Sequence, residues 1–436
     1  MKIRISRNYP KSLCLFVVYF TLFVGFFTFN FGVTNSILYV CDAIVIFLTV
    51  IELKNSARNI LNKPMLLFSV PLMLLISQGS ICALFNGFHV SRWLWSIRNW
   101  GRLFAFCLIT VAVLKKKDCN RICRFTLKLY HINVAVVLFQ FLFLKKWYGQ
   151  DALNGLFGRN TSSIHLTMTF IVVAIATAKY VAKQINWKKF LTTMIEVFIV
   201  SIVAELRVIP VIVVIIVAVA YFSTFRLTVQ SISNVVLFAC AFVFLINCAS
   251  FLLKIFYPDT ALSYTISGII NAASTKGGYG YSGGIDRLTF ITVINENIFT
   301  NWDERMFGIG VGNAEYSAVT SLCSLFFFTH GGDLGYLNFS SAMIYIETGV
   351  CGLFLYSFGF VALFLWFLNL IRSASRRASP RDTIFYEILG CEMTVINIFY
   401  IIYNNLQRTD ASYLLGFYLA VAFIGTKKEK HICQAR

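Results

Sequence analysis

Apolar segments of nearly membrane-spanning length follow one another along almost the whole of this chain. A helix needs about 20 apolar residues to cross a ~30 Å hydrocarbon core, where only helices and closed barrels satisfy the backbone. The chain is 58% hydrophobic and 13% charged, whereas a soluble domain is roughly 25% charged. The pattern predicts an all-α polytopic membrane protein with about 12 transmembrane helices. The predicted spans are residues 12–32, 36–52, 64–85, 101–114, 122–144, 164–182, 190–206, 208–224, 232–256, 349–371, 383–405 and 411–425.

The distribution of Lys and Arg predicts which side of the membrane each connection faces. With the N-terminus inside, the inner connections carry about twice as many Lys and Arg residues as the outer ones, which is the bias of cytoplasmic loops. Both termini are therefore expected in the cytoplasm, and Arg98, Arg102 and Arg408 count among the outer charges. The basic residues 1–11 precede an apolar run without a small-residue cleavage site, so we expect this run to remain as the first helix.

One polar stretch, residues 257–338, interrupts the apolar segments and is expected outside the cell. Connections in compact domains usually take about 4–6 residues, and much longer ones are commonly functional or disordered. This stretch carries Arg287, His330 and Asp333, so we interpret it as the extramembrane half of an active site. The predicted organisation is a transmembrane bundle (1–256), an outer loop with interfacial helices (257–348), and a second transmembrane part with a cytoplasmic tail (349–436).

Hydrophobic periodicity predicts short elements inside the polar stretch. Residues 285–299 have helical spacing and are expected on the membrane surface, and the apolar residues 321–328 are expected to enter the interface. The glycines of 307–313 (FGIGVGN) predict a turn. Residues 336–347 predict an amphipathic helix. If this helix continued unbroken to the end of the next span it would be about 57 Å long, so we expect a bend near Gly349 and Gly352.

Several function classes are disfavoured. The net charge is +19, but no basic stripe interleaved with aromatic residues is present, so nucleic-acid binding is not expected. The twelve cysteines include no CxxC pair, which removes the simplest thiolate metal sites. No Walker A sequence is present. A simple thiolate metal site and an ATP-driven step are therefore not expected, and no cofactor is predicted.

Three arginines are the strongest candidates for binding a ligand: Arg159, Arg207 and Arg287. A charge at the edge of the bilayer must be solvated, paired or used, and the guanidinium fork matches phosphate in bidentate fashion. The arginines are thus predicted to bind the diphosphate of a membrane lipid. The alternatives are a topological or headgroup-facing role for Arg159 and a structural ion pair between Glu205 and Arg207.

His330 and Asp333 are the candidates for a general base, because a sugar hydroxyl that attacks must lose its proton. Asp333 is alternatively the N-cap of the following helix, and His330 an ordinary loop residue. Glu347, at the border of water and lipid, either pairs with an arginine or tunes one of these groups. Asp42 lies inside the second predicted span and is expected to point inward.

Four short motifs, in this order, resemble those of the O-antigen polymerase/ligase superfamily, which contains Wzy-type polymerases of surface polysaccharides and lipid A-core ligases. The topology, with one large external loop before the last few spans, is similar as well. The motifs are GLFGRNTSSIH (155–165), AELRVI (204–209), FGIGVGNAEYS (307–317) and YIETGVCGLF (345–354). The second motif departs from the family's Ser-x-Ser-Arg-Gly turn at Glu205 and Leu206.

The segment before the fourth motif favours a polymerase over a ligase. Ligase-type members carry a His-Asn pair where this chain has Asn338 and Phe339. The run HGGDLGYLNF (330–339) instead resembles polymerases with a Ser-Asp-x-Gly-Tyr-Leu segment, which favours Asp333. The resemblance implies a GT-C-like fold and a metal-independent glycosyltransferase of the inner (plasma) membrane.

The implied reaction moves a glycan from undecaprenyl diphosphate to the acceptor sugar of a second lipid-linked repeat unit, in the synthesis of O-antigen, capsule or exopolysaccharide. Membrane lipid, a chain-length regulator and a flippase are the implied partners. The implied residues are Arg159, Arg207 and Arg287 at the diphosphate, His330 or Asp333 as base, and Glu205, Asn338 and Glu347 in support.

Two alternatives stay open. A ligase would attach the finished glycan to lipid A-core. A flippase for lipid-linked oligosaccharides, which is not an enzyme, would also be a basic multi-span protein, but it needs no long external loop and should contain a charged central cavity.

Overall fold

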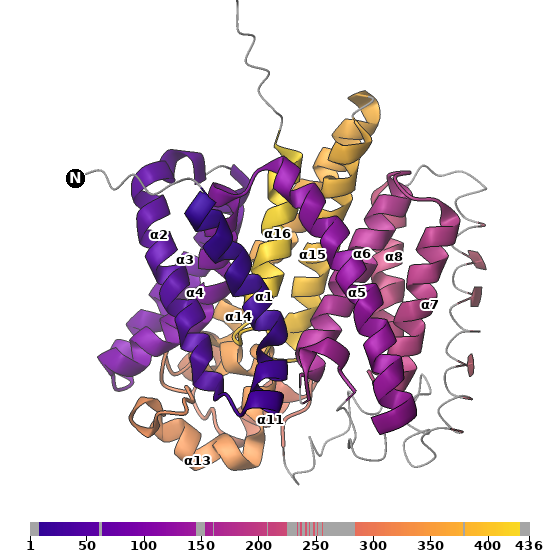
Figure 1. Ribbon diagram of the computed structural model, residues 1–436. Coiled ribbons are helices and arrows are strands. Elements are labelled where there is room, and N and C mark those ends of the chain that lie inside the picture. The colour runs from indigo at the N-terminus through magenta and orange to yellow at the C-terminus, as the bar shows by residue number, and fades with distance from the viewer. Residues whose placement is uncertain are drawn as a thin grey trace, which may run out of the picture.

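The chain is helical throughout the part that the structure describes (Figure 1). The computed structural model describes residues 8–60, 63–144, 153–159, 161–206, 208–224, 284–377 and 380–427, with isolated positions between 233 and 255. Arg207, most of the ninth predicted span and residues 257–283 of the polar stretch lie outside this description. The helices are α1 (Asn8–Phe31), α2 (Leu38–Ile60), α3 (Lys63–Phe85), α4 (Val90–Val113), α5 (Lys116–Leu144), α6 (Ser162–Val181), α7 (Trp187–Val203), α8 (Ile209–Ser223), α11 (Phe290–Asn297), α12 (Trp302–Phe307), α13 (Leu325–Leu334), α14 (Ser340–Arg377), α15 (Arg381–Tyr403) and α16 (Ser412–Thr426).

The protein is membrane-embedded, as predicted. Among the described residues, 6 helices are long and apolar enough to cross a membrane, namely α1, α3, α5, α6, α14 and α15. The helices α8 and α16 are apolar but shorter. A described helix overlaps every predicted span except the ninth, and the total of twelve spans stays a prediction.

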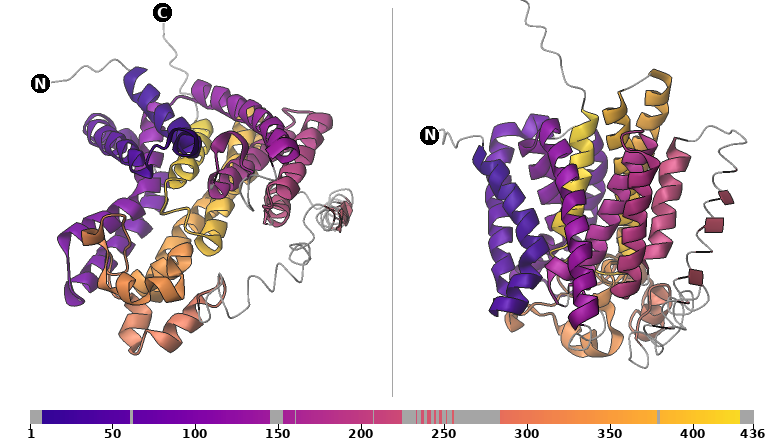
Figure 2. Two further views of the ribbon diagram at one scale, coloured as in Figure 1. Left: turned by 60° about the horizontal axis from the view of Figure 1, so that its bottom comes forward. Right: turned by 45° about the vertical axis from the view of Figure 1, so that its right-hand side comes forward.

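The helices pack side by side around α15 and α16. Helix α14 contacts α3 and α15, α16 contacts α4 and α15, and α6 contacts α8 and α15. The start of α1 and the end of α16 lie at one end of the bundle, whereas α11 and α13 lie at the opposite end (Figures 1 and 2). We call this opposite end the loop end. The predicted topology likewise puts the polar stretch across the bundle from these two helix ends.

The described part of the polar stretch has a hydrophobic core of its own at the loop end. This outer core contains Ile285, Phe290, Val293, Ile294, Phe299, Ala314, Leu334, Tyr336, Phe339, Ala342, Met343, Tyr345 and Ile346. Its centre is the first part of α14, where residues 340–349 are all buried. These residues are covered by protein instead of lipid, which explains why α14 begins at Ser340, well before the predicted span at 349. The predicted helix at 336–347 is likewise corrected, because residues 336–338 form a separate 3₁₀ turn.

The predicted bend in α14 is present at Gly349. Its φ of 64° and ψ of −164° are not helical, and a positive φ favours glycine because glycine has no Cβ. The end of α12 lies against the kink, since a Cβ on Gly349 would be 2.3 Å from the backbone carbon of Met306. The kink thus allows the backbone at the end of α12 to pack directly against α14.

Replacing Gly349 with alanine is expected to destabilise the loop end, because a left-handed conformation and a backbone clash must both be relieved. Strained conformations of this kind cost about 1–3 kcal/mol before any clash is counted. The check is the midpoint of thermal unfolding in detergent, together with protease cleavage within 284–339. Gly332→Ala is the matched control, because a Cβ there meets nothing within 4 Å and alanine favours a helix. Equal midpoints for the two variants would contradict the role of the kink.

Candidate functional site

The glycine-rich turn 308–313 is inserted into the kink of α14. The amides of Ile309 and Gly310 donate hydrogen bonds to the carbonyls of Ile346 and Glu347, both at 2.9 Å. The amide of Val311 donates to the carbonyl of Gly79 on α3 at 2.9 Å. The predicted turn is therefore confirmed, and it supplies donors to carbonyls that the kink leaves unpaired.

Gln78 on α3 hydrogen-bonds both to Phe307, just before the glycine-rich turn, and to α14. Gln78 Nε2 donates to the carbonyl of Phe307 at 2.7 Å and to that of Thr348 at 3.3 Å. The turn also approaches α3 closely, because a Cβ on Gly310 would be 2.3 Å from the Cα of Ala83. The motifs at 307–317 and 345–354 are thus two halves of one structural unit.

Glu347 is fully buried beside this unit. Its Oε1 accepts a hydrogen bond from the amide of Gly312 at 2.9 Å. Its Oε2 accepts from Trp100 Nε1 at 2.9 Å and from Ser96 Oγ at 3.2 Å. A buried carboxylate requires such donors and a counter-charge, and the predicted pairing with an arginine is present, since Arg408 Nη2 lies 3.8 Å from Oε2.

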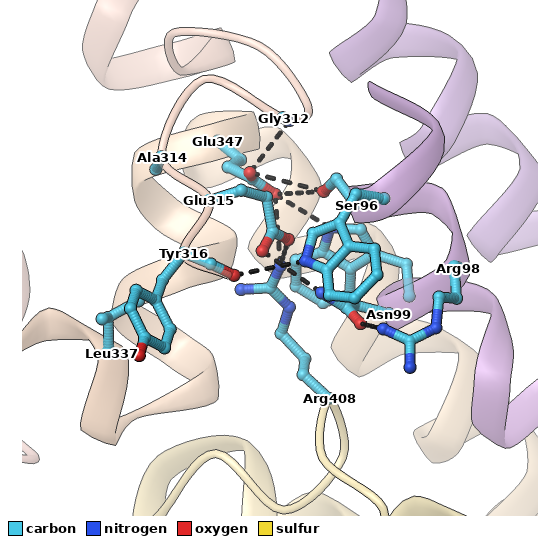
Figure 3. Close-up of polar contacts among 12 residues, drawn as sticks. Ser96, Arg98, Asn99, Gly312, Ala314, Glu315, Tyr316, Leu337, Glu347 and Arg408 are labelled. Carbon is cyan, nitrogen blue, oxygen red and sulfur yellow. Dashed lines mark hydrogen bonds and ion pairs between the residues drawn. The ribbon is translucent and has the colours of Figure 1, made fainter. Parts of the chain in front are cut away.

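Arg408 is shared between two carboxylates (Figure 3). It rises from the turn between α15 and α16 and pairs with Glu315 as well as with Glu347. Its guanidinium lies 4.3 Å from the ring centroid of Trp100, and Asn99 Nδ2 donates to Glu315 Oε2 at 3.2 Å. The segment 312–315, helix α4, helix α14 and the α15–α16 turn are therefore tied together by one buried charge.

A second group of charges includes Arg98 and Arg102, which alternate along α4 with the residues of the first group. Asp42 on α2 accepts a hydrogen bond from Arg98 Nε at 3.0 Å, and its Oδ1 lies 3.1 Å from Arg102 Nε. The Tyr413 hydroxyl at the start of α16 also donates to Asp42. Arg102 Nη1 lies 3.0 Å from Asp410 Oδ1. Burial raises the pKa of the Asp410 carboxyl, and the Arg102 guanidinium opposes that rise. The predicted inward orientation of Asp42 is confirmed.

We call the two groups together the outer charge cluster: Asp42, Ser96, Arg98, Asn99, Trp100, Arg102, Glu315, Glu347, Arg408, Asp410 and Tyr413. Its three guanidinium groups face four carboxyl groups. The cluster therefore has no surplus positive charge with which to hold a diphosphate. Its chemistry is that of a buried ion-pair network, which fixes geometry more than it adds stability.

Of this cluster, the sequence-based site included only Glu347, because Arg98, Arg102 and Arg408 were counted as outer loop charges. Helix α4 begins at Val90, well before the predicted span at 101, and its polar residues are tolerated because protein groups satisfy them. The local signal was the spacing on α4. Ser96 and Trp100 recur at i and i+4, as do Arg98 and Arg102, and residues so spaced share one helix face.

The structure brings several predicted site residues into one neighbourhood around residues 334–339. Arg287 is half-buried, donates from Nε to the carbonyl of Tyr403 at 3.1 Å, and lies 4.7 Å from the Tyr403 ring centroid and 5.6 Å from that of Phe339. The amide of Ile285, two residues earlier, donates to the carbonyl of Leu334 at 2.8 Å. The exposed Asp333 and Asn338 flank that contact in sequence.

His330 and Asp333 both lie on α13, three residues apart. The His330 ring packs 4.8 Å from the Phe326 ring. The N-cap alternative for Asp333 is wrong, because Asp333 lies inside α13 and the next α-helix starts only at Ser340. The catalytic role of either residue stays a prediction.

Arg159 and Glu205 lie on a different part of the bundle. The guanidinium of Arg159 is 5.9 Å from the Phe29 ring near the end of α1, and Glu205 is buried in the turn between α7 and α8 with a φ of 55°. Arg207, its suggested partner, lies outside the described residues. The part of the site formed by these three residues stays a prediction.

The segment before Arg159 is held by a set of side-chain amide groups. Gln140 exchanges two hydrogen bonds with the backbone of Gly155, and Asn133 Oδ1 accepts from the amide of Leu156 at 2.7 Å. His165 is fully buried with Asn133 and Asn154 against its two ring nitrogens. These side chains form hydrogen bonds with other protein groups, so we interpret them as structural.

Comparison with other proteins adds no family assignment. No protein-family model matches the chain, and no curated protein matches it either. The motif resemblance described above therefore stays a resemblance.

Proposed function

We propose that the protein is a polymerase of lipid-linked oligosaccharide repeat units. It transfers a glycan from undecaprenyl diphosphate to an acceptor sugar on a second lipid-linked unit. The observation that carries this proposal is the junction at the loop end, where the polar stretch is built onto a membrane-embedded bundle and holds Arg287 half-buried. A lipid diphosphate presents its phosphates at the membrane surface, and an arginine fork there matches their geometry.

The arrangement of the loop end supports the proposal in a second way. The turn at 307–317 is locked into the kink beside Glu347 by backbone hydrogen bonds and by Arg408. This lock gives the outer stretch a fixed position over the bundle. Transfer between two large lipid-linked substrates requires such positioning, because misplaced reactants lose much of the rate enhancement.

The proposed step is a single displacement. The acceptor hydroxyl oxygen forms a bond to the anomeric carbon as the bond between that carbon and the diphosphate oxygen breaks, and the electron pair leaves with the lipid diphosphate. The hydroxyl proton passes to His330 or Asp333. Arg287 neutralises the charge that develops on the leaving oxygen, which we expect to be the largest catalytic contribution. The sequence also assigns Arg207 and Arg159 to the diphosphate, but Arg159 lies on a different part of the bundle from Arg287. The product has inverted anomeric configuration.

The direct test is extension in vitro. Purified protein is incubated with the lipid-linked repeat unit isolated from the producing cells, with and without a chelator. The expected product is a ladder of lipid-linked oligomers in both reactions. A deletion strain separates the alternatives, because loss of a polymerase leaves single repeats on the acceptor, loss of a ligase leaves lipid-linked polymer, and loss of a flippase leaves units facing inward.

The side of the membrane on which the polar stretch lies is testable by labelling. A cysteine replacing the exposed Ser321 is expected to react with a membrane-impermeant maleimide in intact cells, above the background of the unmodified protein. A cysteine replacing the exposed Lys117, at the other end of the bundle, is expected to react only after the membrane is opened. The reverse pattern would place residues 284–339 in the cytosol and end the proposal.

A further inference from the structure

Among the buried polar atoms that have no hydrogen-bond partner within the part of the chain that the structure describes, four lie in or beside the turn between α15 and α16. They are Ser341 Oγ, Gln407 Oε1, Arg408 Nε and Ser412 Oγ. Their residues are 1%, 1%, 5% and 0% exposed. Gln407 and Arg408 belong to the turn that leads from α15 into α16, Ser412 is the first residue of α16, and Ser341 lies in the first turn of α14.

The first turn of α14 and the α15–α16 turn are directly joined. Ser340 Oγ donates to the carbonyl of Asn404 at 3.0 Å, and Asn405 Nδ2 donates to the carbonyl of Leu337 at 2.8 Å. The residues that carry the four atoms therefore belong to segments that meet at one junction of the fold. Arg287, which contacts the carbonyl of Tyr403, approaches the same junction.

Buried polar groups in folded proteins nearly always have partners, because a group that loses water and gains nothing destabilises the folded state. Loose packing does not explain these exceptions. Gln407 Nε2 is fixed by the carbonyl of Asn397 at 2.7 Å, and the Arg408 guanidinium is fixed by Glu315. Each of these two side chains is held by one polar atom and keeps another unpaired.

The chemistry of the four atoms favours a neutral hydroxylated ligand. Two are hydroxyls, one is an amide oxygen and one is a guanidinium N–H whose charge Glu315 and Glu347 already offset. An anion would be repelled by these carboxylates, whereas a sugar hydroxyl both donates and accepts. We propose that Ser341, Gln407, Arg408 and Ser412 line the subsite for the acceptor sugar, an inference that rests on the proposed polymerase function.

The test uses the full-length protein with Ser341→Ala, Ser412→Ala and the double variant. The donor is the isolated lipid-linked repeat unit at fixed concentration, and the acceptor is the same oligosaccharide released from its lipid by mild acid. Each lost hydrogen bond is expected to raise the KM for the free acceptor about three- to tenfold. The KM for the donor is expected to stay the same. The midpoint of thermal unfolding is expected to stay the same or to rise.

Thr177→Val is the matched control. Thr177 Oγ1 is also buried without a partner among the described residues, but it lies in the last turns of α6, away from this junction. The variant should leave the acceptor KM unchanged. An acceptor KM equal to that of the unmodified protein in the serine variants would overturn the subsite and leave water as the partner. A lower unfolding midpoint in those variants would also overturn it, by showing that the hydroxyls hold the fold. If the unmodified protein transfers nothing, the proposed function itself fails.

Discussion

Replacing Arg287 with alanine is expected to lower the rate of chain extension by about 10²–10³-fold, the loss typical when one group that stabilises a developing negative charge is removed. The reason is the position of the residue. Arg287 is half-buried where the outer core meets the end of α15, held by the carbonyl of Tyr403 and by two aromatic rings. A cation held in this way needs little reorganisation when charge develops on a diphosphate oxygen.

The measurement is the initial rate of ladder formation with the isolated lipid-linked repeat unit. Arg287→Lys is expected to retain intermediate activity, because lysine keeps the charge and loses the planar fork. Arg305→Ala is the matched control on the same stretch, since Arg305 is exposed and donates to the carbonyls of Asn295 and Phe299. Its rate should stay within a few-fold of the unmodified protein. Equal losses in both variants would remove Arg287 from the mechanism.

Replacing Arg408 with methionine is expected to lower the free energy of unfolding by about 3–5 kcal/mol, the usual result of leaving a buried charge without its partner. Two carboxylates depend on this one guanidinium, and both are almost completely buried, Glu347 at 0% and Glu315 at 3% exposure. The contact between the outer stretch and the turn between α15 and α16 should weaken first, because Arg408 joins them.

The measurement is unfolding in detergent, followed by protease cleavage within 284–339. Adding Glu315→Gln and Glu347→Gln to Arg408→Met should restore most of the lost stability, because the buried charges then disappear together. Lys11→Met is the control for a peripheral ion pair, since Lys11 pairs with Asp118 and its side chain is 32% exposed. It should cost no more than about 1 kcal/mol. A single Arg408→Met variant as stable as the unmodified protein would show that the cluster contributes nothing.

The membrane class and the bend in α14 were predictable because both depend on local properties of the sequence. Long apolar runs have few alternatives to membrane helices. The glycine at position 349 marks the one place where α14 leaves helical geometry, and the length of the continuous pattern already required a bend.

The outer charge cluster was not predictable from charge counting. Arg98 and Arg102 lie in a helix whose polar side chains are neutralised by Asp42 and Asp410, and these contacts join residues far apart in sequence. A rule that counts Lys and Arg residues in loops does not consider whether they form ion pairs. The spacing along α4 was the only local trace, and it needs the positions of α2 and α16 before it can be interpreted.

The sequence predicted only part of the candidate site, because contacts between residues far apart in sequence decide which side chains meet. Arg287, Asp333 and Asn338 come together because residues 285 and 334 pair through their backbones, which no periodicity reveals. The early start of α14 has a similar cause, since residues 340–348 resemble an interfacial helix in composition but are enclosed by the outer core.

The order of residues in the chain has a consequence for biogenesis. Glu315 precedes Arg408 by 93 positions, and α14, α15 and α16 are synthesised after the stretch that they anchor. That stretch must therefore wait for its counter-charge until the turn between α15 and α16 has emerged from the ribosome. Premature termination within the last two helices should leave an unassembled segment, which is a natural substrate for quality-control proteases.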